Sequence, residues 1–473
     1  MSFKVRLLSL ILVFVMFACF ALSGCNLIGV FDSGIEGLMQ PPMPDEEKYK
    51  IKLLLDTLVS GTITFCSPKS GNYRMACTEH DIDGDKSDEA VVFYQEKLNG
   101  VTQMYIHFFR KDANEWVSID QAIKADGEDI YSFEIVDLNR DGTDEIIVLW
   151  ENDDSHKSSK TLAVYEYDNE SFSFDCVTTQ CEDVTIVDLK YGGSYELVTI
   201  SLETTETATV AKAAIYEYDK YGLIDIKDFV LDSGVIGYAG IVSSTIDDAE
   251  NNNANASGER EYFSHVMIDC YYQSRNQLMT YVIYWPKDIF TKEYMDEPEM
   301  FDPDPSLVIR DNVITSRDVD NDGTIDVPTV MEFCKVFKNN GDTTTSSMEQ
   351  IIAWRTYDTT LFTSVYMVVN TEFNYTVTIP EKWISDISIM RSSSKNEYIF
   401  YKWDAEGNQR EGLYFKVRVF KASDWNKNVA IYTGNALDYN YEKVATNAAG
   451  TLVYALSVGD YGLPDEITFT LNE

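Results

Sequence analysis

The chain has 473 residues and a formal net charge of −40, from 78 acidic and 38 basic residues. This negative field repels the phosphates of nucleic acids, so we exclude nucleic acid as a partner. The length exceeds what one hydrophobic core normally supports and predicts at least two domains.

The N-terminal segment has the features of an export signal. Lys4 and Arg6 precede an apolar stretch, which ends with small residues just before Cys25. This arrangement is typical of a secretory signal, and the stretch is shorter than the ~20 residues of a membrane span. Leu22–Cys25 resembles a bacterial lipobox. We therefore expect a signal peptide at residues 1–24, lipidation of Cys25 and anchoring to the outer face of the cytoplasmic membrane. An ordinary signal peptide or a retained apolar helix are the alternatives.

A tether and a helix are expected next. Residues 25–44 contain several glycines and the run Gln40–Pro44, a composition that spaces a domain from a surface. A helix is predicted over Asp45–Val59, with acidic residues at its favourable N-terminal end. One apolar stripe at helical spacing predicts the face that packs on a core: Ile51, Leu54, Leu55 and Leu58.

From Gly61 onward the pattern is that of β-strands. Runs of aromatic and β-branched residues alternate with turn residues at short spacing, as at 104–109, 162–167, 214–218 and 281–285. The segments Tyr165–Phe172 and Tyr216–Gly222 are near copies of each other. This similarity indicates an internal repeat.

Three acidic loops carry the clearest motif: Asp81–Glu89, Asp137–Glu145 and Asp318–Asp326. Oxygen-bearing side chains stand at loop positions 1, 3, 5 and 9, and position 7 can offer its carbonyl oxygen. Calcium takes six to eight oxygen ligands, which alternate residues of a tight turn can supply. The predicted calcium ligands are Asp81, Asp83, Asp85, Ser87 and Glu89, then Asp137, Asn139, Asp141, Thr143 and Glu145, and finally Asp318, Asp320, Asp322, Thr324 and Asp326.

An EF-hand shares part of this pattern but is excluded. It requires a bidentate glutamate at position 12 and flanking helices. Position 12 is occupied by Val92, Val148 and Thr329, and strand-like residues follow each loop.

Degraded copies of the loop extend the repeat. Ile186–Leu197 aligns with the second loop, but Lys190 and Gly192 replace the oxygen ligands at positions 3 and 5. An ammonium group there should abolish ion binding. Residues 267–273 are read as a further, more eroded copy. The resulting period of about 50 residues suits a four-stranded blade, and the acidic, asparagine-rich segment 247–258 is read as a surface insertion.

We therefore expect a mainly β fold, with a β-propeller of five or more blades and the N-terminal helix in residues 45–367. Pro328 predicts an outer edge strand after the third loop, and Ile351–Tyr366 predicts a final hairpin. Residues 368–473 have alternating strand patterns without an acidic loop. They are expected to form a separate, small α+β domain.

The motifs resemble a known family. The loops and the strand after each resemble the FG-GAP/VCBS repeats of integrin-α-like propellers. The order of lipobox, short helix, Arg74–Asp85, Ser316–Gly323 and a tail that opens Tyr375–Trp383 is similar to that of VCBS-repeat lipoproteins of anaerobic Gram-positive bacteria. The resemblance implies calcium and a propeller but no particular activity. The first loop departs from it, with Lys86 in place of glycine and Gly84 two residues early, which predicts a strained or weaker site.

The ions are expected to be structural, since binding to such turns commonly contributes folding free energy; a sensor or ligand-bridging role is the alternative. Disulfides are left open: Cys66–Cys77 and Cys176–Cys181 are the local pairs, and free buried thiols are the alternative. None of the four histidines belongs to a catalytic motif. We expect a non-catalytic binding or scaffold protein with a protein or glycan ligand. The alternatives are a secreted carbohydrate-active or other hydrolytic propeller, and a purely structural envelope lipoprotein.

Overall fold

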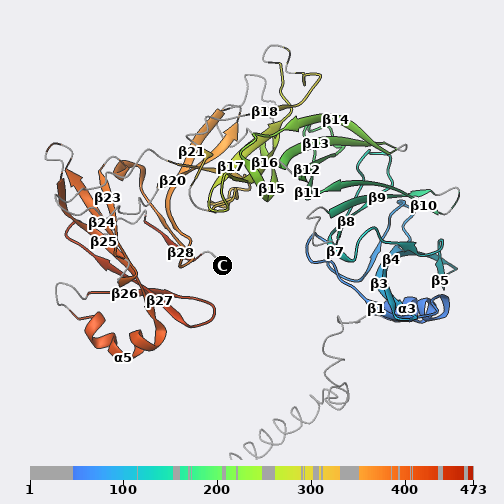
Figure 1. Cartoon of the computed structure of the whole chain (residues 1–473), viewed down its shortest axis with the longest axis horizontal. Coiled ribbons are helices and arrows are strands. Elements are labelled where there is room, and N and C mark those ends of the chain that lie inside the picture. Colours follow the sequence, from blue (N-terminus) through green and yellow to red (C-terminus); the bar gives the residue numbers. More distant parts are fainter. Residues whose placement is uncertain are drawn as a thin grey trace, which may run out of the picture. The chain divides into compact units, whose positions relative to one another are not determined.

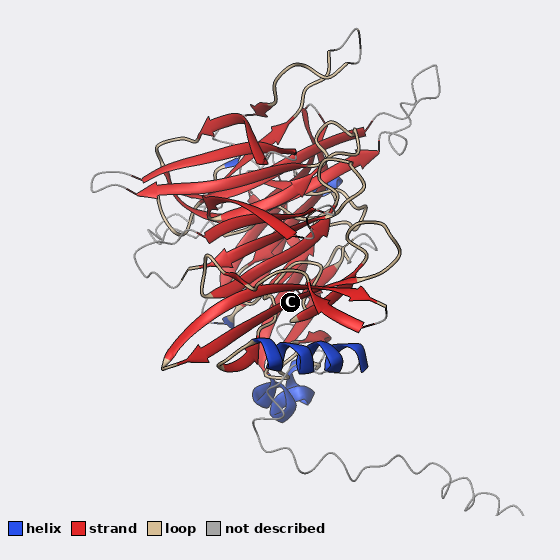
Figure 2. Cartoon of the chain, turned by 90° about the vertical axis from the view of Figure 1, so that its right-hand side faces the viewer, coloured by secondary structure: helices blue, strands red, loops and turns tan. Residues whose placement is uncertain are grey.

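The computed structural model describes residues 46–471, apart from residues 114, 153–159, 169–170, 172, 205–208, 220–221, 248–261, 289–290, 292, 302–307, 311–312, 331–350, 359, 385, 393–394, 405, 407–408, 435–439 and 463–466. Strands predominate in this part of the chain, with two α-helices and one short 3-10 helix among them (Figure 2). Backbone contacts divide the chain into two compact units. The first unit ends at Glu134 and also includes Asp168–Ser173, and the second contains the remaining residues from Ile135 onward.

The first unit contains helix α3 (Glu46–Leu58) and a six-stranded sheet. Ile51 and Leu55 of α3 are fully buried against Tyr94 and Trp116 of the sheet, which agrees with the predicted helix and its apolar stripe. Leu58 is an exception, since it is 48% exposed at the end of the helix. The strands are β1 (Thr62–Phe65), β2 (Cys77–His80), β3 (Glu89–Leu98), β4 (Val101–Asp112), β5 (Glu115–Ser118) and β6 (Ile123–Lys124).

Three antiparallel sheets of four strands follow. The first has the order β10-β9-β8-β7, the second β11-β12-β13-β14 and the third β15-β16-β17-β18 (Figure 1). The strands are β7 (Asp129–Val136), β8 (Glu145–Glu151), β9 (Lys160–Asp168), β10 (Ser173–Cys181), β11 (Asp183–Val187), β12 (Glu196–Thr204), β13 (Thr209–Asp219), β14 (Gly222–Val230), β15 (Val235–Asp247), β16 (Tyr262–Tyr272), β17 (Leu278–Tyr284) and β18 (Glu299–Phe301).

The second and third of these sheets pack face to face in the second unit. Val198 and Ile215 from β12 and β13 share one buried cluster with Ile268 and Tyr281 from β16 and β17. Alternate residues of each strand point to the same face, so apolar residues on one face of each sheet form this common core.

Two five-stranded sheets complete the second unit. One has the order β19-β20-β21-β22-β28 and the other β23-β24-β25-β27-β26. Helix α5 (Ala422–Tyr432) buries Trp425 beside Phe420. The strands are β19 (Asp326–Val330), β20 (Ile351–Asp358), β21 (Thr360–Asn370), β22 (Tyr375–Thr378), β23 (Ile387–Ser392), β24 (Glu397–Asp404), β25 (Gln409–Lys421), β26 (Glu442–Thr446), β27 (Leu452–Val458) and β28 (Phe469–Leu471); the 3-10 helix η1 is Glu381–Trp383.

Most strand predictions are confirmed, including the hairpin of β20 and β21. Pro328 lies in β19 at the end of its sheet order, as expected for a residue without a backbone N–H donor. The predicted boundary between residues 367 and 368 falls inside β21. The strands β22 and β28, which belong to the predicted C-terminal domain, extend the same sheet as β19.

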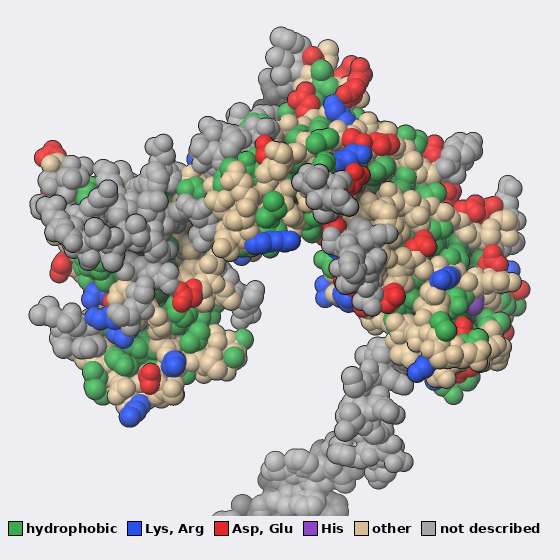
Figure 3. Space-filling view, in the orientation of Figure 1, with side chains coloured by type: hydrophobic (Ala, Val, Ile, Leu, Met, Phe, Trp, Pro, Cys, Tyr) green, Lys and Arg blue, Asp and Glu red, His purple; other side chains and the backbone are tan. Residues whose placement is uncertain are grey.

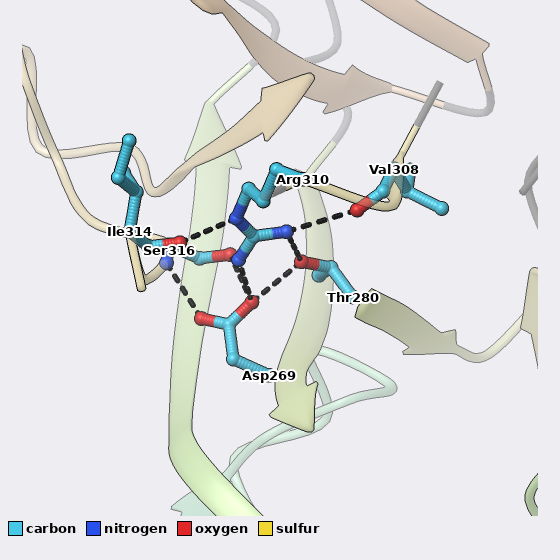
Figure 4. Close-up of polar contacts among 6 residues, drawn as sticks. All are labelled: Asp269, Thr280, Val308, Arg310, Ile314 and Ser316. Carbon is cyan, nitrogen blue, oxygen red and sulfur yellow. Dashed lines mark hydrogen bonds and ion pairs between the residues drawn. The ribbon is translucent and has the colours of Figure 1, made fainter. Parts of the chain in front are cut away.

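The prediction of an eroded loop at residues 267–273 is wrong. Asp269 lies inside β16 and is 1% exposed. Its carboxylate binds Arg310 Nη2 at 2.7 Å, Thr280 Oγ1 at 2.5 Å and the backbone N–H of Ser316 at 2.6 Å (Figure 4). Arg310 also donates to the carbonyl oxygens of Val308 and Ile314. An acidic residue that resembled a loop start in the sequence is thus one half of a buried ion pair.

Several expectations concern residues outside the described part of the chain. The signal peptide, Cys25, the tether and most of the predicted insertion at 247–258 belong to this group. No disulfide joins the cysteines of the described segments, so neither local pair forms a covalent staple there. Among the described helices, none has the length and apolar composition needed to span a membrane.

Candidate metal-binding loops

The three acidic loops and the degraded copy Asp188–Glu196 share one backbone conformation. In each, the carboxylate at position 1 accepts a hydrogen bond from the backbone N–H of position 6, over 2.6–3.0 Å. Positions 4 and 6 both have positive φ. The φ angles at position 4 are 73° for Gly84, 63° for Arg140, 49° for Tyr191 and 62° for Asn321. Those at position 6 are 73° for Lys86, 91° for Gly142, 87° for Gly193 and 88° for Gly323.

The acid at position 9 also has the same place in all four loops. One oxygen of its carboxylate accepts the backbone N–H of position 2, at 2.7 Å from Leu138 to Glu145 and at 2.9 Å from Leu189 to Glu196. The residue before the loop pairs with position 9 across the strands, as in Val187↔Glu196. Each loop is therefore closed by its own first and last acids.

Burial makes the position 9 carboxylates costly in the ionised form. Desolvation raises the pKa of Glu145 to about 8 and the pKa of Glu89 and Glu196 to about 7. A cation beside such a carboxylate offsets this cost, because opposite charge favours ionisation. The closed end of each of these three loops thus holds a carboxyl group that either binds a proton near neutral pH or is ionised beside a cation.

The second loop forms an oxygen cluster with a residue outside it. A carboxylate oxygen from each of Asp141, Glu145 and Glu166 lies within 4.8 Å of the others. Glu145 is fully buried, and its Oε1 has no hydrogen-bond partner among the described residues. Glu166 comes from β9, and sequence reasoning missed it. The repeated Tyr-Glu-Tyr segment contained the signal, since it placed a glutamate at the same point of two strands.

The first and third loops gather acids from within themselves. Carboxylate oxygens of Asp81, Asp83 and Asp85 lie within 4.8 Å of one another, as do those of Asp318, Asp320 and Asp326. Asp81 Oδ1 is buried and has no hydrogen-bond partner in the described structure. The first loop therefore also presents a buried carboxylate oxygen that only a cation or a donor from outside would satisfy.

The remaining predicted ligands lie in the same loops and brace the backbone. The position 3 side chains of Asp83 and Asn139 accept the N–H of position 5. In all three loops the position 5 carboxylate accepts the N–H of position 7. The acceptors are Asp85, Asp141 and Asp322, and the donors are Ser87, Thr143 and Thr324.

The degraded loop holds a positive charge of its own. Lys190 Nζ lies 3.8 Å from Glu196 Oε1 and 2.5 Å from Glu217 Oε1. The ammonium also lies 4.0 Å from the ring centroid of Trp285, a cation–π distance. The prediction that this loop does not bind an ion is consistent with this arrangement, since the ammonium already neutralises the buried acid.

The second and the degraded loop are cross-linked within the second unit. Tyr195 N donates to Leu138 O at 2.8 Å, and the Arg140 guanidinium donates to Gly192 O. A surface groove of about 580 Å³ runs along them, lined in part by Asp137, Asp141 and Tyr195. The second loop is thus buttressed by its neighbour and open to solvent on one side.

The donor set fits calcium. It consists of carboxylate, amide and carbonyl oxygens without sulfur or imidazole, the composition that hard divalent cations prefer. Acidity as such is not confined to the loops, since Asp and Glu side chains spread over several sheets with Lys and Arg among them (Figure 3). The buried carboxylate oxygens without partners distinguish the loops from this general surface charge.

Two of the described histidines, His107 and His265, are buried. His107 is 3% exposed and contacts Ser118 Oγ at 2.7 Å and the Phe109 ring at 4.4 Å between centroids. Burial lowers its pKa. His156 lies outside the described residues. Comparison with known proteins gives no assignment: no protein-family model matches the chain, and no curated protein matches it.

Proposed function

We propose that the protein is an exported, lipid-anchored scaffold whose β-sheets are stabilised by calcium bound in the three acidic loops. One observation carries the calcium assignment. The fully buried Glu145 has a carboxylate oxygen without a partner beside carboxylate oxygens of Asp141 and Glu166. The ionised form of a buried, unpaired carboxyl group is strongly unfavourable, and a bound cation stabilises that form.

The proposed architecture is a propeller of the integrin-α type. Three consecutive four-stranded antiparallel sheets support it, because repeated sheets of this size are the units of propellers. Each acidic loop also stands directly before a strand, namely β3, β8 or β19. Calcium would then fix the turn by which the chain enters each of these strands.

The proposed role is non-catalytic binding or scaffolding at the cell surface, with anchoring through Cys25. The shared geometry of the loops supports a structural role for the ions. In each loop the acids at positions 1 and 9 accept backbone N–H groups of the loop itself, so an ion bound by these acids would hold the loop closed. The groove along the second loop is a candidate surface for a protein or glycan ligand.

The test is a thermal melt of the mature protein, purified in detergent, with calcium and with a chelator. At a calcium concentration 100-fold above Kd, each occupied site should add about 2.7 kcal/mol to the free energy of unfolding. Chelation should therefore lower Tm, and Asp141→Ala should reduce that drop. Asp225→Ala, which removes an exposed acid of β14 outside the loops, is the matched control. An identical Tm with and without chelator would refute the calcium assignment.

A further inference from the structure

We propose that Glu166 of β9 is a ligand of the cation in the second loop, which makes this site different from the other two. The inference rests on the proposed calcium function and adds to it a residue that lies 21 positions beyond the end of the loop motif, from Glu145 to Glu166.

The geometry around Glu166 is that of a prepared ligand. Its carboxylate lies within 4.8 Å of carboxylate oxygens of Asp141 and Glu145. Three acids at this distance repel one another unless a cation lies among them. The Tyr218 hydroxyl donates to Glu166 Oε2 at 2.7 Å; this neutral donor orients the carboxylate without compensating its charge.

The neighbouring sheet contains an independent copy of the same arrangement. The strand register pairs Ile146 with Tyr165 in one sheet and Leu197 with Tyr216 in the next. Glu145 precedes Ile146 and Glu166 follows Tyr165 in the first sheet. Glu196 and Glu217 have the same positions relative to Leu197 and Tyr216, so the two pairs of glutamates correspond.

In that copy a cation is present as part of the chain. Lys190 Nζ lies 3.8 Å from Glu196 Oε1 and 2.5 Å from Glu217 Oε1. The same pair of glutamates thus flanks a positive charge where the loop has lost its oxygen ligands. In the second loop, position 3 is Asn139 rather than lysine, so the corresponding charge has to come from a bound ion.

The other two loops have different residues at this point. The register places Thr356 opposite Asp326 in the third loop, where its hydroxyl donates to Asp326 Oδ1 at 3.0 Å. In the first loop Ala90 pairs with Phe109, which places Arg110 at the corresponding point. Neither residue is an anionic ligand. Calcium affinity rises with the number of charged ligands. Glu166 gives the second site four carboxylates, as many as the first and third loops have at their ligand positions, and so compensates for the neutral Asn139 at position 3.

The first experiment is calcium titration of the full mature protein by calorimetry, with terbium luminescence as a second readout. Glu166→Gln should weaken one calcium site by at least about tenfold and leave the others unchanged. Glu217→Gln is the matched control, since it alters the corresponding glutamate beside Lys190 and should leave every calcium affinity unchanged. Wild-type affinities in Glu166→Gln would overturn the inference. Absence of calcium binding in the wild type would instead refute the proposed function.

The second experiment restores the degraded loop. Lys190→Asn with Gly192→Asp recreates the oxygen pattern of the second loop. An aspartate fits at position 192, because a Cβ added there would have no neighbouring atom within 4 Å and the backbone is not left-handed. The number of bound calcium ions should rise by one, and Glu217→Gln in this background should weaken the new site by at least about tenfold. A new site that is insensitive to Glu217→Gln would contradict the role assigned to this strand position.

Discussion

At the scale of single residues, the first loop solves a backbone problem in an unusual way. All four loops need left-handed backbone at positions 4 and 6. The second, third and degraded loops have glycine at position 6, whereas the first has Gly84 at position 4 and Lys86 at position 6. The early glycine that departed from the family pattern is therefore explained, because it relieves one of the two left-handed positions. Lys86 is left with the other.

Lys86→Gly should stabilise the protein. A left-handed conformation costs a residue with a side chain about 1–2 kcal/mol, and glycine loses part of that gain through greater freedom in the unfolded chain. We expect a net gain of about 1 kcal/mol in the free energy of unfolding, measured by denaturant titration in calcium. Lys97→Gly, in strand β3 of the same sheet, is the control and should destabilise. A loss of stability in Lys86→Gly would show that the lysine side chain itself supports the loop.

At the scale of elements, Arg310 is joined to the β16–β17 sheet by a buried ion pair with Asp269 and by two backbone hydrogen bonds to Leu278. Asp269 and Arg310 are almost completely inaccessible, and their hydrogen bonds reach Thr280, Ile314 and Ser316 (Figure 4). Asp269 also binds the backbone N–H of Ser316, two residues before the third acidic loop begins at Asp318. The ion pair therefore contributes to the position of the start of that loop.

Arg310→Met should destabilise the protein by about 3–5 kcal/mol, because it leaves the Asp269 carboxylate buried without its cation. The combined variant Asp269→Leu with Arg310→Met should lose less than the sum of the two single variants, measured by denaturant titration as a double-mutant cycle. Lys227→Met breaks the exposed Lys227–Glu297 pair and should have a far smaller effect, since water replaces that contact. Additive losses in the cycle would mean that the two side chains act independently.

At the scale of the whole molecule, the acidic loops occur in both compact units, the first loop in one and the second and third in the other. The degraded loop belongs to the second unit and carries its own ammonium group. Removal of calcium should therefore affect both units but spare one loop. This difference offers an internal control within a single molecule.

Hydrogen exchange with and without a chelator should distinguish the three acidic loops from the degraded loop. Local opening determines exchange, and a ligand that binds only the closed form suppresses it. Chelation should speed exchange at the starts of β3, β8 and β19, and leave the start of β12 unchanged. Equal acceleration at β12 would contradict the assignment of Lys190 as the built-in cation.

Much of the fold was predictable because its signals are local. The strand patterns, the helix stripe at Ile51 and Leu55, and the edge strand at Pro328 depend on alternation, helical spacing and a missing N–H. Leu58 failed the same pattern, because the last turn of a helix can extend past the surface it packs against. The pairing of β22 with β28 was not readable either, because it joins residues far apart in the chain.

The sequence by itself determined the acidic loops, because nine consecutive residues contain both the acids and the backbone donors that those acids bind. Only the tertiary structure decided which residues from other parts of the chain lie beside the acids of each loop. Glu166 lies beside the second loop because β8 pairs with β9. Lys190 contacts Glu217 because β12 pairs with β13. Asp269 looked like part of a loop until Arg310, 41 residues later, was brought beside it. In each case the deciding interaction is electrostatic and acts across a few ångströms, a proximity that sequence separation does not reveal.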